Sequence, residues 1–401
     1  MKDKKNNFNK STICHVNTTF IHKAASARRT FSIIKALSKN NYRVIQVTGR
    51  DFEPHKDWNL SGIKFVSIPS LVKYINPVND IIALFKLCKF FRNLKPQLVH
   101  THLAKAGILG RLAARWAHIP YIVHTVHGPT FSKNIHPIKR YLYLFLERIC
   151  GRLTSYFIFV GEELRDEYIK NRGCSIEKTK VIQTGRPKSD FDFAERITQE
   201  EIQMIRKKFS KNRKSFLIGY IGRLVPSKSQ HMAIRVVKMV RDRGIDGHLA
   251  LIGDGHVAEE KKYEAKLRRL AEDLKVGEYV YFMGYQPDVL TYMKAVDVLI
   301  LTSKYEGLPN IAVEAGIVSM PLVSFKVCGI SEVIQNGETG YIVDQEDVNA
   351  MADKLIFLAR NPGVSKKIGH NAQQNIKNLY TIEKMIKEQL EFYESILKNG
   401  K

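Results

Sequence analysis

Cysteine is scarce in this chain, and its placement suggests neither a cross-link nor a metal site. The five cysteines are odd in number, widely spaced and never paired as Cys-x-x-Cys. Disulfide frameworks use an even set of cysteines, and common zinc sites use closely spaced pairs. The pattern argues against both, and we expect structural thiols in a reducing cytosol.

Long apolar runs are also missing. No segment approaches the roughly 18 consecutive apolar residues that span a bilayer. The best stretches, residues 81–91 and 141–150, are short and contain charged side chains. The first ten residues are basic and polar and lead into no apolar core of a signal peptide. We therefore expect a cytoplasmic protein that is neither exported nor membrane-spanning.

Acidic residues are few in the first half of the chain. Residues 1–200 hold 34 Lys and Arg against 15 Asp and Glu, a net charge of +19, whereas residues 201–401 hold 30 against 24, a net charge of +6. Residues 81–152 contain 12 basic residues and one acid, Glu147. Such a one-sided field attracts nucleic acid, an anionic membrane leaflet or a phosphate-bearing substrate. Interleaved aromatics and a recognition helix are lacking, so we expect no nucleic-acid partner.

The order of apolar segments predicts an α/β fold. Short apolar runs alternate with segments of helical periodicity along the whole chain, as is typical of parallel sheets with crossover helices. A polar segment at residues 187–214 interrupts the alternation and is interpreted as a linker with a short helix. The prediction is two doubly wound parallel-sheet domains facing across a cleft, with ligands at the carboxyl ends of the strands. The expected strands are residues 13–17, 43–48, 64–68, 98–101, 121–125, 156–159 and 180–183, then 216–221, 248–252, 280–283, 298–301, 322–324 and 340–343.

The first segment with candidate functional residues is 306–314, Glu-Gly-Leu-Pro-Asn-Ile-Ala-Val-Glu, which directly follows an expected strand. Asn310 is placed to cap a following helix, whose free N–H groups form a site for a diphosphate. Glu314 then lies about one turn inside the helix, where it can accept hydrogen bonds from ribose, and Glu306 in the loop can meet a sugar. On spacing alone, an ordinary strand–helix connection with two solvated glutamates is the better explanation, because the helix dipole favours a Glu in the first turn anyway.

The second segment is residues 219–228, Gly-Tyr-Ile-Gly-Arg-Leu-Val-Pro-Ser-Lys. Arg223 and Lys228 follow a strand and can neutralise phosphate oxygens, and Gly222 lets a ligand approach the backbone. The segment fits neither the P-loop nor the Gly-x-Gly-x-x-Gly pattern. Taken alone, the segment is better explained by two surface cations.

Histidines gather at two expected strand ends, in His100-Thr-His102 and His124-Thr-Val-His127-Gly128. Zinc binding by His102, His124 and His127 is conceivable, but no cysteine or acid accompanies them. A single functional histidine, His127, is the preferred interpretation, with the others structural.

In this order, the three features resemble glycosyltransferase family 4, whose members have the GT-B fold. The likeness covers about residues 11–397. Residues 306–314 match the family's Glu-x7-Glu motif, Gly222, Arg223 and Lys228 match its diphosphate-binding residues, and His127 matches its acceptor-domain histidine. The nearest likeness is to the branch that builds bacterial capsular, exopolysaccharide or lipopolysaccharide chains.

The resemblance implies a retaining, metal-independent transfer from a nucleotide sugar. It implies an acceptor-binding domain at residues 1–190, a donor-binding domain at 191–376, and a helix at 377–401 that packs back toward the first domain. The implied catalytic residues are His127, Arg223, Lys228 and Glu306, without a metal or cofactor. The implied donor-binding residues are Gly222, Gly307, Leu308, Asn310, Ile311 and Glu314.

The chain departs from the family pattern in three places. Ala24-Ala25-Ser26 replaces the glycine pair of the first strand–helix loop, Cys328-Gly-Ile-Ser-Glu332 replaces Gly-Gly-x-Pro-Glu, and Gly185-Arg186-Pro187 replaces Gly-Val-Asp. The first change affects the place where the family's backbone approaches the donor diphosphate. None of the three removes a charged candidate residue.

The sequence does not define the sugar, the base or the acceptor. We expect UDP with a hexose or N-acetylhexosamine, and a polyprenyl-diphosphate-linked glycan as acceptor. A sugar-nucleotide epimerase shares the fold class but does not need both Glu306 and Glu314. The positive charge also fits a nucleic-acid-binding protein, and the fold class also fits a non-catalytic scaffold, although a scaffold would normally have lost Arg223, Lys228 or Glu314.

A peripheral contact with anionic membrane is the last expectation. The helix expected at residues 137–153 mixes Lys139, Arg140, Arg148 and Arg152 with apolar side chains, as an interfacial helix does. The apolar residues concerned are Leu142, Leu144, Phe145 and Ile149. It is equally consistent with the sequence that these apolar residues simply face the core of the domain.

Overall fold

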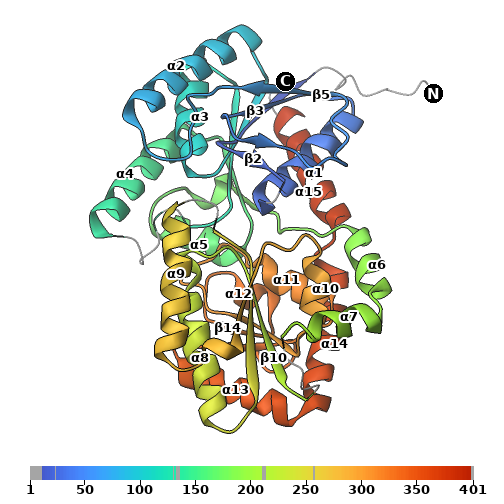
Figure 1. Ribbon diagram of the computed structural model, residues 1–401. Coiled ribbons are helices and arrows are strands. Elements are labelled where there is room, and N and C mark those ends of the chain that lie inside the picture. The colour runs from blue at the N-terminus through green and yellow to red at the C-terminus, as the bar shows by residue number, and fades with distance from the viewer. Residues whose placement is uncertain are drawn as a thin grey trace, which may run out of the picture. The chain divides into compact units, whose positions relative to one another are not determined.

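The computed structural model describes residues 11–22, 24–129, 131, 136–209, 214–255 and 258–398. The chain forms two compact units, one of residues 1–185 with 382–401 and one of residues 186–381 (Figure 1). The division thus falls at Gly185, five residues before the boundary implied by the family resemblance. The last helix begins at Ile382. None of the helices in the described part of the chain is long and apolar enough to span a membrane.

The first unit is built on a seven-stranded parallel sheet with the strand order β5-β3-β1-β6-β7-β8-β9. Both faces of this sheet are buried along β1. Ile13 points into one core cluster, whereas Cys14 and Val16 point into another on the opposite face. These strands are β1 (Thr12–Val16), β3 (Arg43–Thr48), β5 (Ile63–Ser67), β6 (Leu98–His102), β7 (Tyr121–Val126), β8 (Tyr156–Phe159) and β9 (Thr179–Val181). A separate pair is formed by β2 (Phe20–Ile21) and β4 (Phe52–Glu53).

Helices cover both faces of this sheet. On one face, α1 packs with the C-terminal helix α15, and their apolar residues share a cluster with Ile13. On the other face, α2 and α3 pack side by side over Cys14 and Val16, and α4 also packs against α3 (Figure 1). The helices of this unit are α1 (Ala25–Lys39), α2 (Pro77–Leu94), α3 (Ala104–Trp116), α4 (Pro137–Leu153), α5 (Glu162–Lys170) and α15 (Ile382–Lys398).

The second unit contains a six-stranded parallel sheet with the order β12-β11-β10-β13-β14-β15. Two parallel, doubly wound sheets confirm the predicted fold class. The strands are β10 (Phe216–Ile221), β11 (Gly247–Ile252), β12 (Val280–Gly284), β13 (Val298–Leu301), β14 (Leu322–Phe325) and β15 (Tyr341–Val343). The helices are α6 (Lys188–Arg196), α7 (Gln199–Arg206), α8 (Gln230–Asp242), α9 (Ala258–Asp273), α10 (Val289–Lys294), α11 (Asn310–Ile317), α12 (Ile330–Val333), α13 (Val348–Arg360) and α14 (Pro362–Leu379).

The polar segment at residues 187–214 is not mainly a linker. Its described part contains two helices, α6 and α7, and both pack against α10 of the second unit. Helix α7 begins with a complete capping box, in which Thr198 and Glu201 bond each other's backbone N–H groups. The interpretation as a linker with one short helix was therefore wrong, because amphipathic helices with many charged residues resemble a linker in composition.

Candidate active site

Each sheet has one point where the direction of strand succession reverses. In the second unit this point lies between β10 and β13, which are paired although β11 and β12 come between them in sequence. The loops that follow two such strands diverge, and ligands of doubly wound sheets bind in the space they leave. Residues 222–229 follow β10 and residues 302–309 follow β13, so both predicted motifs lie at this switch point.

The loop after β10 is fixed by hydrogen bonds from its surroundings. Gly222, the first loop residue, donates its N–H to the carbonyl of Ile252, 2.9 Å away. The Tyr220 hydroxyl donates to the Lys228 carbonyl at 2.6 Å, and the Thr302 hydroxyl donates to the Ser229 carbonyl at 2.9 Å. Because Thr302 directly follows β13, the two loops of the switch point are joined to each other and held in one conformation.

Charged side chains from these loops meet at the switch point. Lys228 Nζ lies 2.5 Å from Glu306 Oε1, which brings together two residues 78 positions apart. Arg223 is 44% exposed, and its Nε lies 3.6 Å from the carboxylate of Glu260 at the start of α9. A cation that is still largely accessible can bind a further anion, such as a phosphate group.

Glu314 is held by a residue whose role the sequence did not reveal. Arg186 Nη1 donates to Glu314 Oε1 at 2.7 Å, and Arg186 Nη2 lies 2.6 Å from Asp190 Oδ2. Burial tends to lower the pKa of Arg186, but Glu314 and Asp190 outweigh it, so the pKa lies above its ordinary value. Arg186 stands at one of the departures from the family pattern, which is the one feature of the sequence that sets it apart.

The start of α11 differs from the prediction in one respect. Asn310 is the first residue of the helix, Pro309 occupies the cap position, and no side chain caps the helix. Leu308 and Ile311 are buried at 5% and 8% exposure, so their side chains serve packing and only their backbone can meet a ligand. The predicted cap by Asn310 was therefore wrong, although free N–H groups at this helix start are still expected.

The departure Cys328-Gly-Ile-Ser-Glu332 keeps the glycine that the packing requires. Gly329 has a φ of +74°, and a Cβ atom there would lie 2.4 Å from the carbonyl oxygen of Gly307. The loop after β14 thus packs directly against the Glu306–Gly307 turn. Any larger residue at position 329 would push this turn away from its place at the switch point.

In the first unit, the predicted histidine heads a chain of hydrogen bonds. His127 directly follows β7, and its Nε2 lies 3.2 Å from His102 Nδ1. His102 Nε2 lies 3.0 Å from His15 Nδ1, and His15 Nε2 lies 3.4 Å from the Tyr393 hydroxyl. The same hydroxyl bonds His100 Nδ1, whose other nitrogen lies 2.7 Å from the Thr125 hydroxyl. The chain runs from the partly exposed His127 into the buried centre of the unit.

These imidazoles are neutral at ordinary pH. Burial lowers the pKa of His15 to about 3, and burial with the nearby positive charge of Arg29 does the same for His127. A neutral imidazole has one donor and one acceptor nitrogen, so the tautomer of each ring in the chain sets that of the next. The buried histidines and Tyr393 therefore hold the His127 ring in a fixed orientation.

Small residues on α3 make room for this arrangement. A Cβ atom on Gly107 would lie 2.5 Å from the ring of His124, and one on Gly110 would lie 2.6 Å from the side chain of Thr101. His124 forms a hydrogen bond with Thr101, and its Nδ1 lies 2.9 Å from the Thr101 hydroxyl. The glycines of the stretch Lys105–Ala113 thus let the helix approach the histidine-bearing strands closely.

Among the described residues, the one grouping close enough to share a metal ion is His15, His100 and His102. It is not the trio of His102, His124 and His127 that the sequence suggested. All six ring nitrogens of the grouping take part in the hydrogen-bond chain described above. These residues are therefore satisfied as a structural cluster, and their donor set contains no charged ligand.

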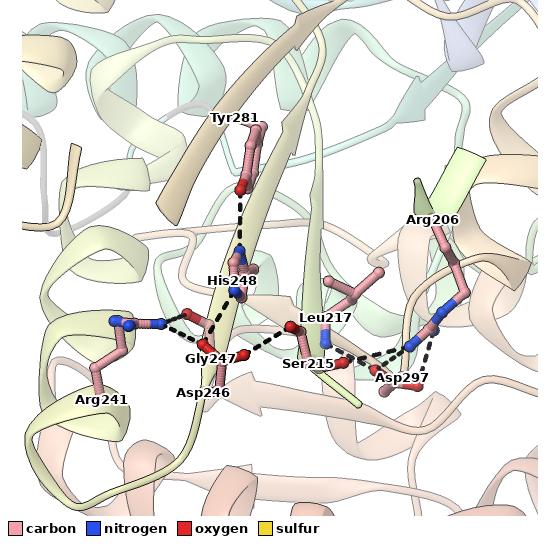
Figure 2. Close-up of polar contacts among 9 residues, drawn as sticks. All are labelled: Arg206, Ser215, Leu217, Arg241, Asp246, Gly247, His248, Tyr281 and Asp297. Carbon is pink, nitrogen blue, oxygen red and sulfur yellow. Dashed lines mark hydrogen bonds and ion pairs between the residues drawn. The ribbon is translucent and has the colours of Figure 1, made fainter. Parts of the chain in front are cut away.

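A cavity of about 530 Å³ lies at the opposite, amino-terminal edge of the second sheet. Figure 2 shows the polar contacts around it: Arg206 binds both carboxylate oxygens of Asp297, and Arg241 lies 2.9 Å from Asp246. These pairs fix the starts of β10, β11 and β13. The predicted site residues all lie at or beyond the other ends of the strands, so this cavity is separate from the candidate site.

Two family sequence profiles match successive parts of the chain and together cover most of it. The profile described as Glycosyltransferase Family 4 matches residues 26–188, and the profile described as Glycosyl transferases group 1 matches residues 201–375. The chain belongs to glycosyltransferase family 4.

The similarity between this glycosyltransferase and two curated relatives extends over nearly the full length of each relative. The UDP-Gal:alpha-D-GlcNAc-diphosphoundecaprenol alpha-1,3-galactosyltransferase of Escherichia coli is 26% identical over 358 residues, 88% of this chain and 90% of the relative. The N,N'-diacetylbacillosaminyl-diphospho-undecaprenol alpha-1,3-N-acetylgalactosaminyltransferase of Campylobacter jejuni is 24% identical, over 92% of this chain and 95% of that protein. The solved structure of Anabaena HepE with UDP and glucose is similar in fold, with a TM-score of 0.79, 19% identity and coverage of 96% of this chain and 99% of that one.

Two further residues of this glycosyltransferase escaped the sequence reasoning. Tyr393 lies on the C-terminal helix α15, nearly 300 positions from the histidine it bonds, and nothing in its sequence context marks it. Arg29 on α1 is buried, donates to the carbonyl of Ile182 at 2.8 Å, and lowers the pKa of His127 by its charge. In the sequence, only its position near an expected strand–helix loop could have drawn attention to Arg29.

Proposed function

We propose that this glycosyltransferase transfers a hexose or N-acetylhexosamine from a UDP-sugar to a lipid-linked glycan in the synthesis of a bacterial surface polysaccharide. The observation that carries the proposal is the grouping of Arg223, Lys228, Glu306 and Glu314 around the switch point of the second sheet. A nucleoside diphosphate sugar offers two phosphates, a ribose and a hexose, and these four side chains have the chemistry to bind all of them.

In this proposal the second unit binds the donor. Arg223, Lys228 and the backbone N–H groups at the start of α11 stabilise the charge that develops on the leaving diphosphate. Glu314, oriented by Arg186, accepts hydrogen bonds from the ribose hydroxyls. Glu306, held by Lys228, binds the transferred sugar.

We further propose that the transfer retains the anomeric configuration and needs no metal ion. The oxygen of the acceptor hydroxyl forms a bond to the anomeric carbon as the bond between this carbon and the diphosphate oxygen breaks. The leaving diphosphate oxygen takes up the proton of the acceptor hydroxyl. No separate general base is then required. Arg223 and Lys228 supply the positive charge that a divalent cation provides in other nucleotide-sugar enzymes.

The proposed class of acceptor is inferred from the names of the two relatives. Both relatives described above are named for acceptors in which a sugar is attached to diphosphoundecaprenol. The excess of basic residues in the first unit fits an acceptor that carries a diphosphate on an anionic membrane. We therefore assign the first unit to the acceptor and expect the protein to contact the cytoplasmic face of the membrane.

The proposal is tested by a donor and acceptor matrix with the purified full-length chain. A thermal-shift screen over UDP-, GDP- and dTDP-sugars identifies the base, because a ligand that binds the folded state raises its melting temperature. Turnover is then followed as nucleoside diphosphate released with sugar-diphosphoundecaprenol as acceptor. We expect release that depends on the acceptor. A product that is an isomer of the nucleotide sugar, formed without acceptor, would instead identify an epimerase.

A further inference from the structure

Helix α2 carries apolar side chains on its solvent side as well as on its core side. Its core face is formed by residues such as Ala83, Leu87 and Phe91, which have no exposed surface. A second apolar row follows the helical spacing i, i+3, i+4, i+7 on the outside and is between 40% and 68% exposed. It consists of Val78, Ile81, Ile82 and Phe85.

Helix α4 repeats this arrangement. Its core face contains Leu144 and Glu147, which are 8% and 1% exposed. The expectation that Leu144 belongs to an outward-facing row was therefore wrong. The outward row is nevertheless present, at the spacing i, i+3, i+4, i+7, i+11 and with 38% to 74% exposure, and consists of Ile138, Tyr141, Leu142, Phe145 and Ile149.

Both helices lie on the same layer of the first unit and begin at the same edge of its sheet. Each packs against α3 within this layer (Figure 1). Each also leads from the carboxyl edge of the parallel strands back to the amino edge, so the apolar rows start at the carboxyl edge. Lys105 at the start of α3 forms an ion pair of 2.5 Å with Asp80 at the start of α2. His127, at the end of β7, lies at this edge as well.

Basic side chains predominate in the segment that carries the two rows, and Asp80, in the first turn of α2, is paired with Lys105. Glu147 is the only acid in residues 81–152, and its carboxylate is buried 2.8 Å from Arg111 Nη2. No carboxylate of the described residues 81–152 is therefore exposed. Among the side chains of this segment that the structure describes, the exposed basic ones are Lys86, Lys89, Arg92, Lys95, Arg115, Arg148 and Arg152.

We propose that the outward rows of α2 and α4 form a docking surface for an anionic lipid bilayer, with the apolar side chains inserted below the headgroups. Paired apolar rows flanked by Lys and Arg have the character of interfacial helices, and each basic residue adds attraction to an anionic leaflet. A second copy of the chain would instead bring an equally positive surface against this one. If the proposed transfer is right, docking places His127 close to a lipid-linked acceptor. The docking itself does not depend on that function.

The test is co-sedimentation of the full-length protein with vesicles of phosphatidylcholine alone or mixed equally with phosphatidylglycerol. We expect binding to the mixed vesicles that weakens with salt, because salt screens the charges, but that does not vanish, because insertion of apolar groups is insensitive to screening. Phe85→Ser with Phe145→Ser removes one large apolar group from each helix. It should lower the partition coefficient about tenfold or more, since burying one Phe contributes about 1.5–3 kcal/mol.

The matched control is Ile176→Ser with Met204→Ser. These side chains are 65% and 64% exposed but lie outside α2 and α4. Vesicle binding by the Phe85 and Phe145 variant that equals the control would overturn the proposal. A change in its oligomeric mass with unchanged vesicle binding would overturn it too, and would show that a second copy covers the surface. A wild-type protein that binds vesicles but transfers no sugar contradicts the proposed function and leaves the docking surface standing.

Discussion

Replacing Arg186 with methionine separates the binding role of Glu314 from a purely structural one. Met preserves most of the apolar volume of the side chain but leaves Glu314 and Asp190 without the cation they share. Losing one partner of a buried ion pair costs about 3–5 kcal/mol. The side chains here are 11% to 23% exposed, so solvent screening should reduce this cost to about 2–4 kcal/mol.

The loss of this ion pair should change both the melting temperature and the KM for the donor. A change of 1 kcal/mol shifts the melting temperature of a unit of this size by about 2–4 °C, so the variant should melt roughly 5–15 °C lower. Without Arg186, Glu314 also loses a contact that orients it. If it binds the donor ribose, the KM for the nucleotide sugar should rise about tenfold or more, because one hydrogen bond to a charged group contributes about 1.5–3 kcal/mol.

Arg206→Met is the matched control for this measurement. Arg206 binds Asp297 through two hydrogen bonds in the same unit, but at the opposite edge of the sheet (Figure 2). Its loss should lower the melting temperature without changing the KM for the donor. Steady-state kinetics below both melting temperatures provide the comparison. Equal donor KM values in the two variants would refute the assignment of Glu314 to the ribose.

Three further outcomes are expected. Exhaustive EDTA treatment should leave turnover unchanged; activity that disappears and returns with one divalent ion would contradict neutralisation by Arg223 and Lys228. Tyr393→Phe should destabilise the first unit by about 1–3 kcal/mol per buried imidazole left unsatisfied, and should alter the pH profile of turnover through His127, whereas an unchanged profile in the folded variant would assign the chain of hydrogen bonds a structural role only. Acid should destabilise the first unit from about pH 6.5 downward, because the unfolded state protonates His15 near that pH and the folded state only near pH 3; the loss for such a histidine is about 2 kcal/mol at pH 5, and melting temperatures that stay flat from pH 7 to pH 5 would contradict the lowered pKa values.

The fold was predictable because each of its signals is local. Strands such as residues 216–221 and 248–252 are largely apolar because helices cover both faces of their sheet. Strands and helices could therefore be recognised within short stretches of sequence. The segment of α6 and α7 was misread because its charged, amphipathic residues pack only along one side, which composition alone does not reveal. Asn310 was misplaced by a single residue at the helix start, where the backbone rather than the side chain decides which residue is the cap.

The candidate site could be predicted only as far as its motifs reach. Arg223, Lys228 and Glu306 stand in strand–loop segments whose position in a parallel sheet follows from topology, and the structure gathers their loops at one switch point. Arg186 and Tyr393 come from other parts of the chain, and the pairing of Arg186 with Glu314 spans 128 residues. Such contacts depend on how distant segments pack, and no short pattern encodes them.

The most direct test of the proposed donor site is acceptor-dependent release of nucleoside diphosphate by Glu314→Gln and Arg223→Ala. Each substitution removes a charge that the proposal assigns to the ribose or the diphosphate, at a cost of about 2–5 kcal/mol in a desolvated site. Arg241→Gln, which disturbs an ion pair at the far edge of the same sheet, is the control. We predict turnover reduced at least ~30-fold in both site variants, with circular dichroism spectra like the wild type and a nearly active control. Near-normal turnover by either folded site variant would contradict the placement of the donor at this switch point.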